Sequence, residues 1–215
     1  VWNIETNLQL SAAVKAINPA SITVHGGPST PSYENDCKMF FANNPHVDVA
    51  VRGEGELTFA DMLDALDLAN SRDLAVLRDI PGLTYRTADG VCRTADRERI
   101  ADVNTIPSPY LMGLFDEFGS VKAGAIIETN RGCPYGCTFC DWGSATTSRV
   151  RKYDLQRVFD EMAWCANNGI ATISVADANF GMFSRDVEIA EELARLRALT
   201  DFPKSFGVSY AKNTV

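Results

Sequence analysis

Residues 131–143 read Arg131-Gly132-Cys133-Pro134-Tyr135-Gly136-Cys137-Thr138-Phe139-Cys140-Asp141-Trp142-Gly143, with three cysteines at C-x3-C-x2-C spacing. The loop is rich in glycine and proline and follows the apolar run at 125–127. Thiolates spaced by two or three residues let one short loop wrap a single iron–sulfur cluster. A full set of ligands is four cysteines, and the nearest other one, Cys165, lies in a helix-like segment. One iron would therefore stay open, which predicts chemistry on the cluster.

Two other sites are compatible with three cysteines. Structural zinc prefers four closed ligands, usually from paired C-x2-C or Cys/His sets, and the two histidines, His25 and His46, lie far upstream. A disulfide pair plus one free thiol is the third alternative. The remaining cysteines are scattered and are most simply small core hydrophobes in a reducing compartment: Cys37, Cys92 and Cys165.

The composition is that of an ordinary globular protein, with 46% hydrophobic and 22% charged residues among 215. A net charge of −8 argues against a nucleic-acid partner, because phosphate binding needs a basic stripe. No apolar run approaches the roughly 18 residues of a membrane span, and no basic and apolar leader is visible. We therefore expect a cytoplasmic protein with no membrane partner.

The first segment, residues 1 to about 75, alternates between strand-like and helix-like patterns. Val1 to Ile4 read like the end of a strand already under way, so we expect a piece of a longer protein. β-Branched runs at 21–24 and 47–51 each end in a glycine loop. Helical apolar stripes lie at 8–17, 33–43 and 59–69. The alternation predicts an open parallel sheet, whose ligands bind beyond the carboxyl ends of the strands.

The two glycine loops are His25-Gly26-Gly27-Pro28 and Arg52-Gly53-Glu54-Gly55-Glu56. Neither fits the dinucleotide fingerprint G-x-G-x-x-G, so NAD is not indicated. A glycine after a strand is usually just a turn, and each loop taken alone predicts no more than that.

The connecting segment, residues about 76 to 122, carries Ala88-Asp89-Gly90 between two strand-like runs, which predicts a hairpin. Residues 102–109 read as an extended linker, and we place the domain boundary near Pro109. The last segment, 123–215, predicts strands at 125–129, 170–175 and 206–210, with helices at 155–166 and after an N-cap at Ser184. The basic run from Arg149 to Lys152 is predicted to be a solvated loop that could meet a carboxylate.

The cysteine loop resembles the cluster motif of the radical S-adenosylmethionine (SAM) enzymes, C-x3-C-x-aromatic-C, with Phe139 as the aromatic residue. The glycine loops, the hairpin and the proline-rich joint, in this order ahead of the motif, resemble the cobalamin-dependent members of that family. The resemblance implies an α/β chain: a partial flavodoxin-like (Rossmann-like) cobalamin-binding domain, then the start of a partial (β/α)6 barrel. Functional residues of α/β barrels gather at the carboxyl ends of the strands.

The resemblance implies three cofactors. Cys133, Cys137 and Cys140 would hold a [4Fe–4S] cluster whose open iron binds SAM beside Phe139. Cobalamin would lie at the strand ends of the first segment, lined by Trp2, Asn3, Gly26, Gly27, Gly53 and Glu54. The D-x-H-x-x-G motif that supplies a cobalt ligand in other cobalamin domains is absent, so we expect His25 to be a hydrogen-bonding surface residue at a strand end.

The turn Asp177-Ala178-Asn179 follows the second predicted strand of the last segment, where related enzymes carry a Gly-Gly-Glu-like segment that grips the SAM ammonium. This sequence lacks those glycines. An Asp carboxylate or an Asn carbonyl could still accept from an ammonium. Alternatively, Asp177 and Asn179 cap the strand-to-helix turn, and both interpretations stay open.

The activity that the resemblance implies is methylation of an unactivated carbon (or phosphorus) centre in a small-molecule or peptide substrate. Reductive cleavage of SAM would supply a 5′-deoxyadenosyl radical, methylcobalamin the methyl group, and a flavodoxin- or ferredoxin-type donor the electron. One alternative is a rearrangement or ring closure on the same cofactors. Another, of a different class, is an iron–sulfur electron carrier without catalysis.

Overall fold

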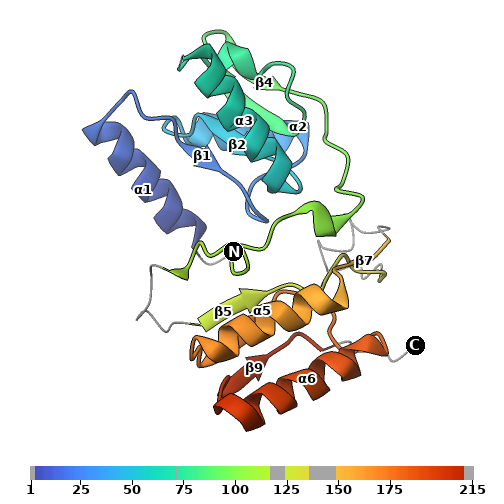
Figure 1. Cartoon of the computed structure of the whole chain (residues 1–215). Helices are drawn as coiled ribbons and strands as arrows, with labels where there is room; N and C mark the ends of the chain where they lie inside the picture. Colours follow the sequence, from blue (N-terminus) through green and yellow to red (C-terminus); the bar gives the residue numbers. More distant parts are fainter. Residues whose placement is uncertain (1–2, 71, 117–123, 136–148, 211–215) are drawn as a thin grey trace. The chain divides into compact units, whose positions relative to one another are not determined.

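The computed structural model describes residues 3–70, 72–116, 124–135 and 149–210 (Figure 1). The chain divides into two compact units, residues 1–100 and 101–215, which we describe separately. The boundary between the two units falls between residues 100 and 101, before Pro109. The division into three segments expected from the sequence stays a prediction. Within the described ranges, no helix combines the length and the apolar character needed to cross a membrane.

The first unit is an α/β unit built on a four-stranded sheet in the order β1-β2-β3-β4. Its elements are α1 Ile4–Ile17, β1 Val24–His25, α2 Glu34–Asn43, β2 Val49–Val51, α3 Gly55–Ala69, η1 Leu74–Leu77, β3 Leu83–Thr87 and β4 Gly90–Arg93. The α/β class is therefore confirmed. The expected strand at the start of the chain is wrong as far as it reaches Ile4, because α1 begins there directly after Asn3.

The expected parallel pairing is confirmed for the two strands of residues 1–75, and the hairpin of the connecting segment makes the complete sheet a mixed one. β1 and β2 are parallel, but β2 pairs antiparallel with β3, and β3 with β4. The predicted hairpin is real, and it adds to the free edge of β2 instead of standing apart as a connector. All three residues of β2 are buried, because the strand lies between β1 and β3 and packs on Met62 and Leu77.

Arg52, the residue after β2, fastens the hairpin to the glycine loop that follows it. The guanidinium is only 4% exposed, and its charge is matched by Asp96 at 3.0 Å. Its hydrogen bonds go to the Leu83 carbonyl, Thr84 Oγ1, the Thr94 and Ala95 carbonyls and Asp96. A buried cation needs several acceptors, and these bonds give the loop at Gly53 a fixed starting point.

The second unit has a three-stranded parallel sheet in the order β5-β8-β9. Its elements are η2 Val103–Thr105, β5 Gly124–Ile127, β6 Asn130–Arg131, β7 Arg151–Lys152, α5 Leu155–Asn167, β8 Thr172–Val175, α6 Arg185–Thr200 and β9 Ser205–Gly207. The predicted strand–helix alternation is confirmed here. Closure of such a sheet into a barrel stays a prediction.

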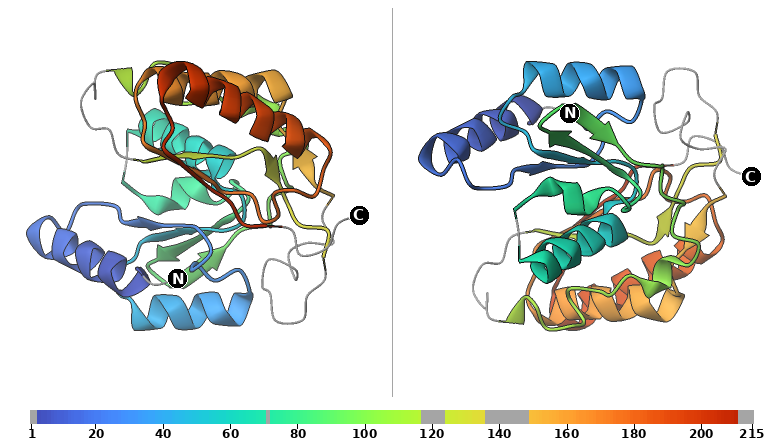
Figure 2. Two further views of the ribbon diagram at one scale, coloured as in Figure 1. Left: turned by 90° about the horizontal axis from the view of Figure 1, so that it is seen from below. Right: turned by 90° about the horizontal axis from the view of Figure 1, so that it is seen from above.

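The sheet of the second unit has one covered and one open face. Ala125, Ile127, Ile173 and Val175 are buried in one apolar cluster with residues of α5 and α6, and the two helices lie side by side (Figures 1 and 2). Alternate residues on the other face are exposed, as in Gly124, Ile126, Thr172 and Ser174 of β5 and β8. The period of two that strands impose therefore separates a core face from an accessible face.

α6 begins where the sequence predicted, directly after Ser184, but without the expected capping hydrogen bond. Ser184 has a helical backbone and its side chain makes no capping hydrogen bond. The buried carboxylate of Asp186 accepts instead from the backbone N–H groups of Gly181 and Phe183, at 2.8 and 3.0 Å. Ser184 therefore stands at the N-cap position, as predicted, but without a side-chain capping bond, and Asp186 satisfies two N–H groups of the turn before the helix.

Candidate functional site

The turn after β8 lies against the residue pair that leads into the cysteine loop. The Asp177 carboxylate is only 2% exposed. It accepts from the Thr129 and Asn130 backbone N–H groups at 2.8 and 3.2 Å, from Asn130 Nδ2 at 2.6 Å, and from the Thr129 hydroxyl. Burial raises the pKa of this carboxyl, and the hydrogen bonds from Thr129 and Asn130 oppose the rise. Both carboxylate oxygens are thus engaged in holding the end of the neighbouring strand.

Asn179 of the same turn reaches the first cysteine of the motif. Its side-chain amide nitrogen lies 3.1 Å from Cys133 Sγ, and Cys133 is 8% exposed. Gly132, just before the cysteine, has φ +119°, a conformation that glycine adopts without strain. The structure therefore brings Asn179 and Cys133 together, whereas Cys137, Phe139 and Cys140 lie outside the described residues.

The two ends of the cysteine-bearing segment are also paired with each other. β6 and β7 form a short antiparallel pair, with Asn130 opposite Lys152 and Arg131 opposite Arg151. The expected solvated loop at 149–152 is therefore wrong for Arg151 and Lys152. Because β6 precedes Cys133 and β7 follows residue 148, this pairing closes the loop at its base.

A polar network that the sequence pattern did not reveal supports this base. The Glu128 carboxylate accepts from Arg131 Nε at 3.0 Å and from the Tyr153 hydroxyl at 3.0 Å. Burial and the Glu128 charge raise the pKa of Tyr153, so the phenol stays a neutral donor. A glutamate three residues before an arginine is a weak signal outside a helix, and it could not have identified Tyr153 as the third member.

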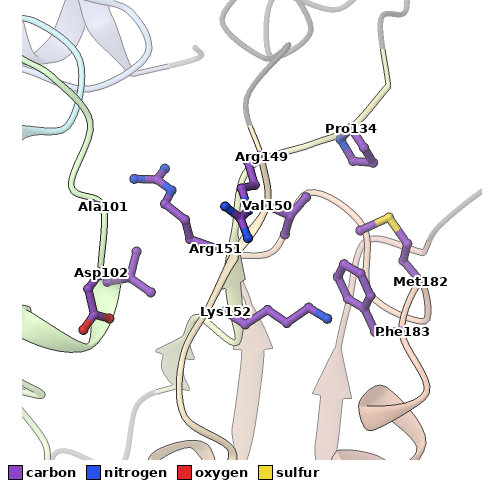
Figure 3. A pocket seen from close by; sticks show the side chains of 10 residues that line it. Ala101, Asp102, Pro134, Arg149, Val150, Arg151, Lys152, Met182 and Phe183 are labelled. Carbon is purple, nitrogen blue, oxygen red and sulfur yellow. The ribbon is translucent and has the colours of Figure 1, made fainter.

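A basic pocket of about 860 Å³ opens beside the loop (Figure 3). Cationic and apolar side chains share its wall: Arg149, Arg151, Lys152, Val103, Val150, Pro134, Met182 and Phe183, with Ala101 and Asp102 opposite. Lys152 Nζ lies 3.6 Å from the centre of the Phe183 ring, toward which it extends in Figure 3. The pocket therefore presents positive charge next to Pro134, the residue after Cys133.

In the first unit, four of the predicted cobalamin residues follow the carboxyl ends of strands, Gly26 and Gly27 after β1 and Gly53 and Glu54 after β2, whereas Asn3 directly precedes α1. A pocket of about 350 Å³ is lined by Asn3 and Gly26 together with residues of α1 and Ser29. Gly27 and Gly53 have φ of +80° and +71°, and a Cβ built on either would have no atom within 4 Å. The Glu54 carboxylate accepts from the Ile100 N–H at 2.9 Å. Trp2 lies outside the described residues.

The hydrogen bonding of His25 and of two nearby hydroxyls bears on what this pocket could bind. His25 Nε2 lies 2.8 Å from Ser11 Oγ, and burial, with a smaller effect of His46, lowers the pKa of the imidazole. The histidine is hydrogen-bonded, as the sequence suggested, but buried and not on the surface. Ser29 Oγ and Thr30 Oγ1 are buried with no hydrogen-bond partner in the described part of the chain. Of the two, Ser29 lines the pocket, where a bound ligand or water would supply the missing partner.

Metal binding by described residues alone is not apparent. Within the ranges that the structure describes, no three His, Cys, Asp or Glu side chains gather as ligands. Cys37 and Cys165 are buried in separate units, as predicted for small core residues, and Cys92 is partly buried. A shared site on Cys133, Cys137 and Cys140 stays a prediction, because the last two lie outside the described residues.

Comparison with known proteins agrees with the resemblance to cobalamin-dependent radical SAM enzymes. No protein-family model matches the chain. Over its whole length the chain is 40% identical to the 2-(S-pantetheinyl)-carbapenam-3-carboxylate methyltransferase of Streptantibioticus cattleyicolor and covers 31% of that protein. It is likewise 37% identical to the cobalamin-dependent radical SAM methyltransferase TokK of Streptomyces tokunonensis, again covering 31% of it. The chain thus spans about a third of the length of these curated relatives.

A solved structure shares the fold. The radical SAM methyltransferase TsrM from Kitasatospora setae, with cobalamin and a [4Fe–4S] cluster bound, superposes with a TM-score of 0.61 at 18% identity. The match covers 94% of this chain and 38% of that one. With the motif loop and the two relatives, this likeness covers both units. The chain belongs to the family of cobalamin-dependent radical SAM enzymes.

Proposed function

We propose that this chain is the cofactor-binding part of a methyltransferase that uses a [4Fe–4S] cluster, SAM and cobalamin. The observation that carries the proposal is the placement of Cys133, fixed at a strand end by Gly132 and contacted by Asn179. Cys133, Cys137 and Cys140 would hold the cluster through their thiolates. When bound, the three cofactors supply radical cleavage of SAM and a transferable methyl group.

The residues of the first unit fit a ligand with a polar edge. Three observations support cobalamin binding at these strand ends: the unpartnered hydroxyl of Ser29, the open space at Gly27 and Gly53, and the pocket at Asn3 and Gly26. A pocket of about 350 Å³ suits one edge or the tail of so large a ligand, not the whole of it. The hydrogen bond between His25 Nε2 and Ser11 Oγ engages the imidazole nitrogen. It therefore supports a cobalt that takes no histidine ligand from this unit.

Asp177 and Asn179, both in the turn after β8, have different roles in this proposal. Asp177 uses both carboxylate oxygens on Thr129 and Asn130, which supports a positioning role for it. Asn179 has an amide nitrogen on Cys133 and a carbonyl oxygen that can accept a hydrogen bond. We therefore assign the SAM ammonium to Asn179 Oδ1, with Phe139 beside it as the motif implies.

The substrate that we propose is a small molecule rather than a peptide. The support comes from the first relative, whose name specifies a carbapenam carboxylate bearing a pantetheine thioether. A related compound is therefore the first methyl acceptor to test. A rearrangement or ring closure on the same cofactors remains the second candidate among radical reactions. A cytoplasmic location stays a prediction.

The test is reconstitution under anaerobic conditions with iron, sulfide and cobalamin. We expect a [4Fe–4S] cluster, bound corrin, and a change in the EPR spectrum on adding SAM, because an open iron takes a new ligand. With reductant and the carbapenam, mass spectrometry should detect a methylated product carrying label from methyl-labelled SAM. A cluster whose EPR spectrum does not change on adding SAM would indicate an electron carrier whose four irons all have protein ligands. His25→Ala is the control for the corrin, and it should leave the cobalamin spectra unchanged.

The basic pocket supports a docking site for an acidic electron donor. The whole chain carries a net charge of −8, so an acidic flavodoxin or ferredoxin is repelled by most of it. Arg149 and Lys152 are exposed and lie beside Pro134, next to a cluster ligand. Local positive charge at this point would steer a donor toward the cluster.

Neutralising this charge should slow reduction by a protein donor only. For Arg149→Gln with Lys152→Gln we expect the rate constant for reduction by flavodoxin to fall about tenfold at low salt, since steering raises association rates by about 10–10³. Stopped-flow spectroscopy across ionic strength measures this. Lys38→Gln with Arg78→Gln removes two exposed charges of the first unit as the control. Equal losses in both double variants, or slower reduction by dithionite, would contradict the assignment.

A further inference from the structure

The contact between Asn179 and Cys133 is held from both sides. On one side, Asp177 is bound to Thr129 and Asn130, four residues or fewer before the cysteine. On the other side, the Phe180 N–H donates to the Ser209 carbonyl at 2.8 Å, and Phe180 is 5% exposed. The half-buried amide of Asn179 lies between these two anchors. Its position therefore follows from the backbone and does not depend on a flexible surface side chain.

An amide donor at this position acts on the electronic state of whatever the sulfur binds. Hydrogen bonds to ligand sulfurs are among the factors that set the reduction potential of an iron–sulfur cluster. Reduction adds negative charge, which delocalises onto the sulfurs, so an N–H group there stabilises the reduced form more than the oxidised form. A donor that is already in place costs no reorganisation when the electron arrives.

We propose that Asn179 is a positioning and tuning residue of the cluster: its side-chain N–H donates to Cys133 Sγ and raises the cluster's reduction potential. This role rests on the proposed function, because it needs a cluster on Cys133. It is separate from SAM binding, which uses the other end of the same amide, Oδ1. One side chain would thus make the cluster easier to reduce and hold the molecule that receives the electron.

Two substitutions separate the two ends of the amide. Asn179→Asp keeps the side-chain shape and an acceptor for the SAM ammonium but has no N–H donor. Asn179→Ala removes both the donor and the acceptor without adding charge. Asn168→Ala is the matched control, because Asn168 also donates its side-chain amide, at 2.8 Å to the Trp164 carbonyl, on the surface of the same unit.

The experiment is an EPR-monitored redox titration of the reconstituted protein without SAM, followed by a SAM-binding titration. For Asn179→Ala we expect the ratio of reduced to oxidised cluster at a fixed potential to fall about tenfold, which is about 59 mV for one electron. In Asn179→Asp this ratio should fall further, because the substitution adds a negative charge beside the cluster. This variant should still bind SAM. Asn168→Ala should match the wild type in both titrations.

The outcomes distinguish the two proposals. Iron-free wild-type protein contradicts the proposed function, and with it the tuning role. A loaded cluster whose potential is unchanged in Asn179→Ala overturns only the tuning role. Weaker SAM binding in Asn179→Ala at an unchanged potential reduces Asn179 to a SAM contact. Loss of iron from both variants, with the wild type loaded, shows that Asn179 is needed to hold the cluster and also overturns tuning.

Discussion

Alanine at Cys133, Cys137 or Cys140 is expected to abolish the cluster. Three thiolates are already one fewer than a full ligand set, and a cluster left with two protein ligands and two open irons would be lost to solvent. Iron and acid-labile sulfide in each variant, reconstituted anaerobically, should fall to the level of untreated apoprotein. The visible absorption of the cluster should disappear with them.

The other three cysteines serve as matched controls for this loss. Cys165 is buried, and burial raises the pKa of its thiol to about 12, so no thiolate is present to bind iron. Cys37 is also buried and donates to the Pro31 carbonyl at 3.2 Å. Cys37→Ala, Cys92→Ala and Cys165→Ala should therefore keep wild-type iron, even where a small cavity lowers stability. Wild-type iron in Cys137→Ala would refute the cluster assignment.

The strands of the parallel sheet and the two helices of the second unit can be predicted because each carries its own local signal. The apolar run before the cysteines, the stripe of α5 and the Asn168-Gly169 stop are readable without knowing any partner. Parallel pairing of β5, β8 and β9 then follows from the alternation of strand and helix. The cysteine spacing is equally local, which is why the motif can be identified from the amino-acid sequence alone.

Features that depend on distant partners could not be predicted. β6 and β7 are two residues each and polar, so neither has a strand pattern, and they pair only because the chain returns to the base of the loop. The hairpin β3–β4 is locally encoded, but its attachment to β2 depends on the tertiary environment of Arg52. Ser184 stands at the N-cap position of α6, but the hydrogen bonds of Asp186 to the preceding turn could not be predicted from the local pattern.

Asp177 is the clearest case, because the sequence left its two roles open. Its partners, Thr129 and Asn130, lie 48 and 47 positions away, beyond the reach of any local pattern. The structure engages both carboxylate oxygens with these partners and leaves Asn179, two positions on, to contact Cys133. Geometry therefore distinguishes an anchor from a cofactor contact where residue type alone does not.

Asp177→Ala is expected to destabilise the second unit by about 2–5 kcal/mol, because each buried donor left without an acceptor costs about 1–3 kcal/mol. Asp177→Asn should cost less, since one amide oxygen still accepts from the backbone N–H groups of Thr129 and Asn130. Urea denaturation of the reduced apoprotein measures the change. Asp160→Ala is the control, because that carboxylate is exposed and accepts from Gln156 on the surface of α5, and it should change stability by less than about 0.5 kcal/mol.

The same substitution should also lower cluster content, because Thr129 and Asn130 fix the strand end from which Gly132 turns the chain into Cys133. Iron retained after gel filtration should fall in Asp177→Ala, fall less in Asp177→Asn, and stay at the wild-type level in Asp160→Ala. The competing interpretation, a carboxylate that binds SAM, predicts the opposite pattern. If Asp177→Ala unfolds like the wild type and keeps its iron but binds SAM about 10- to 100-fold more weakly, as loss of about 1.5–3 kcal/mol would produce, Asp177 is a SAM contact and not an anchor.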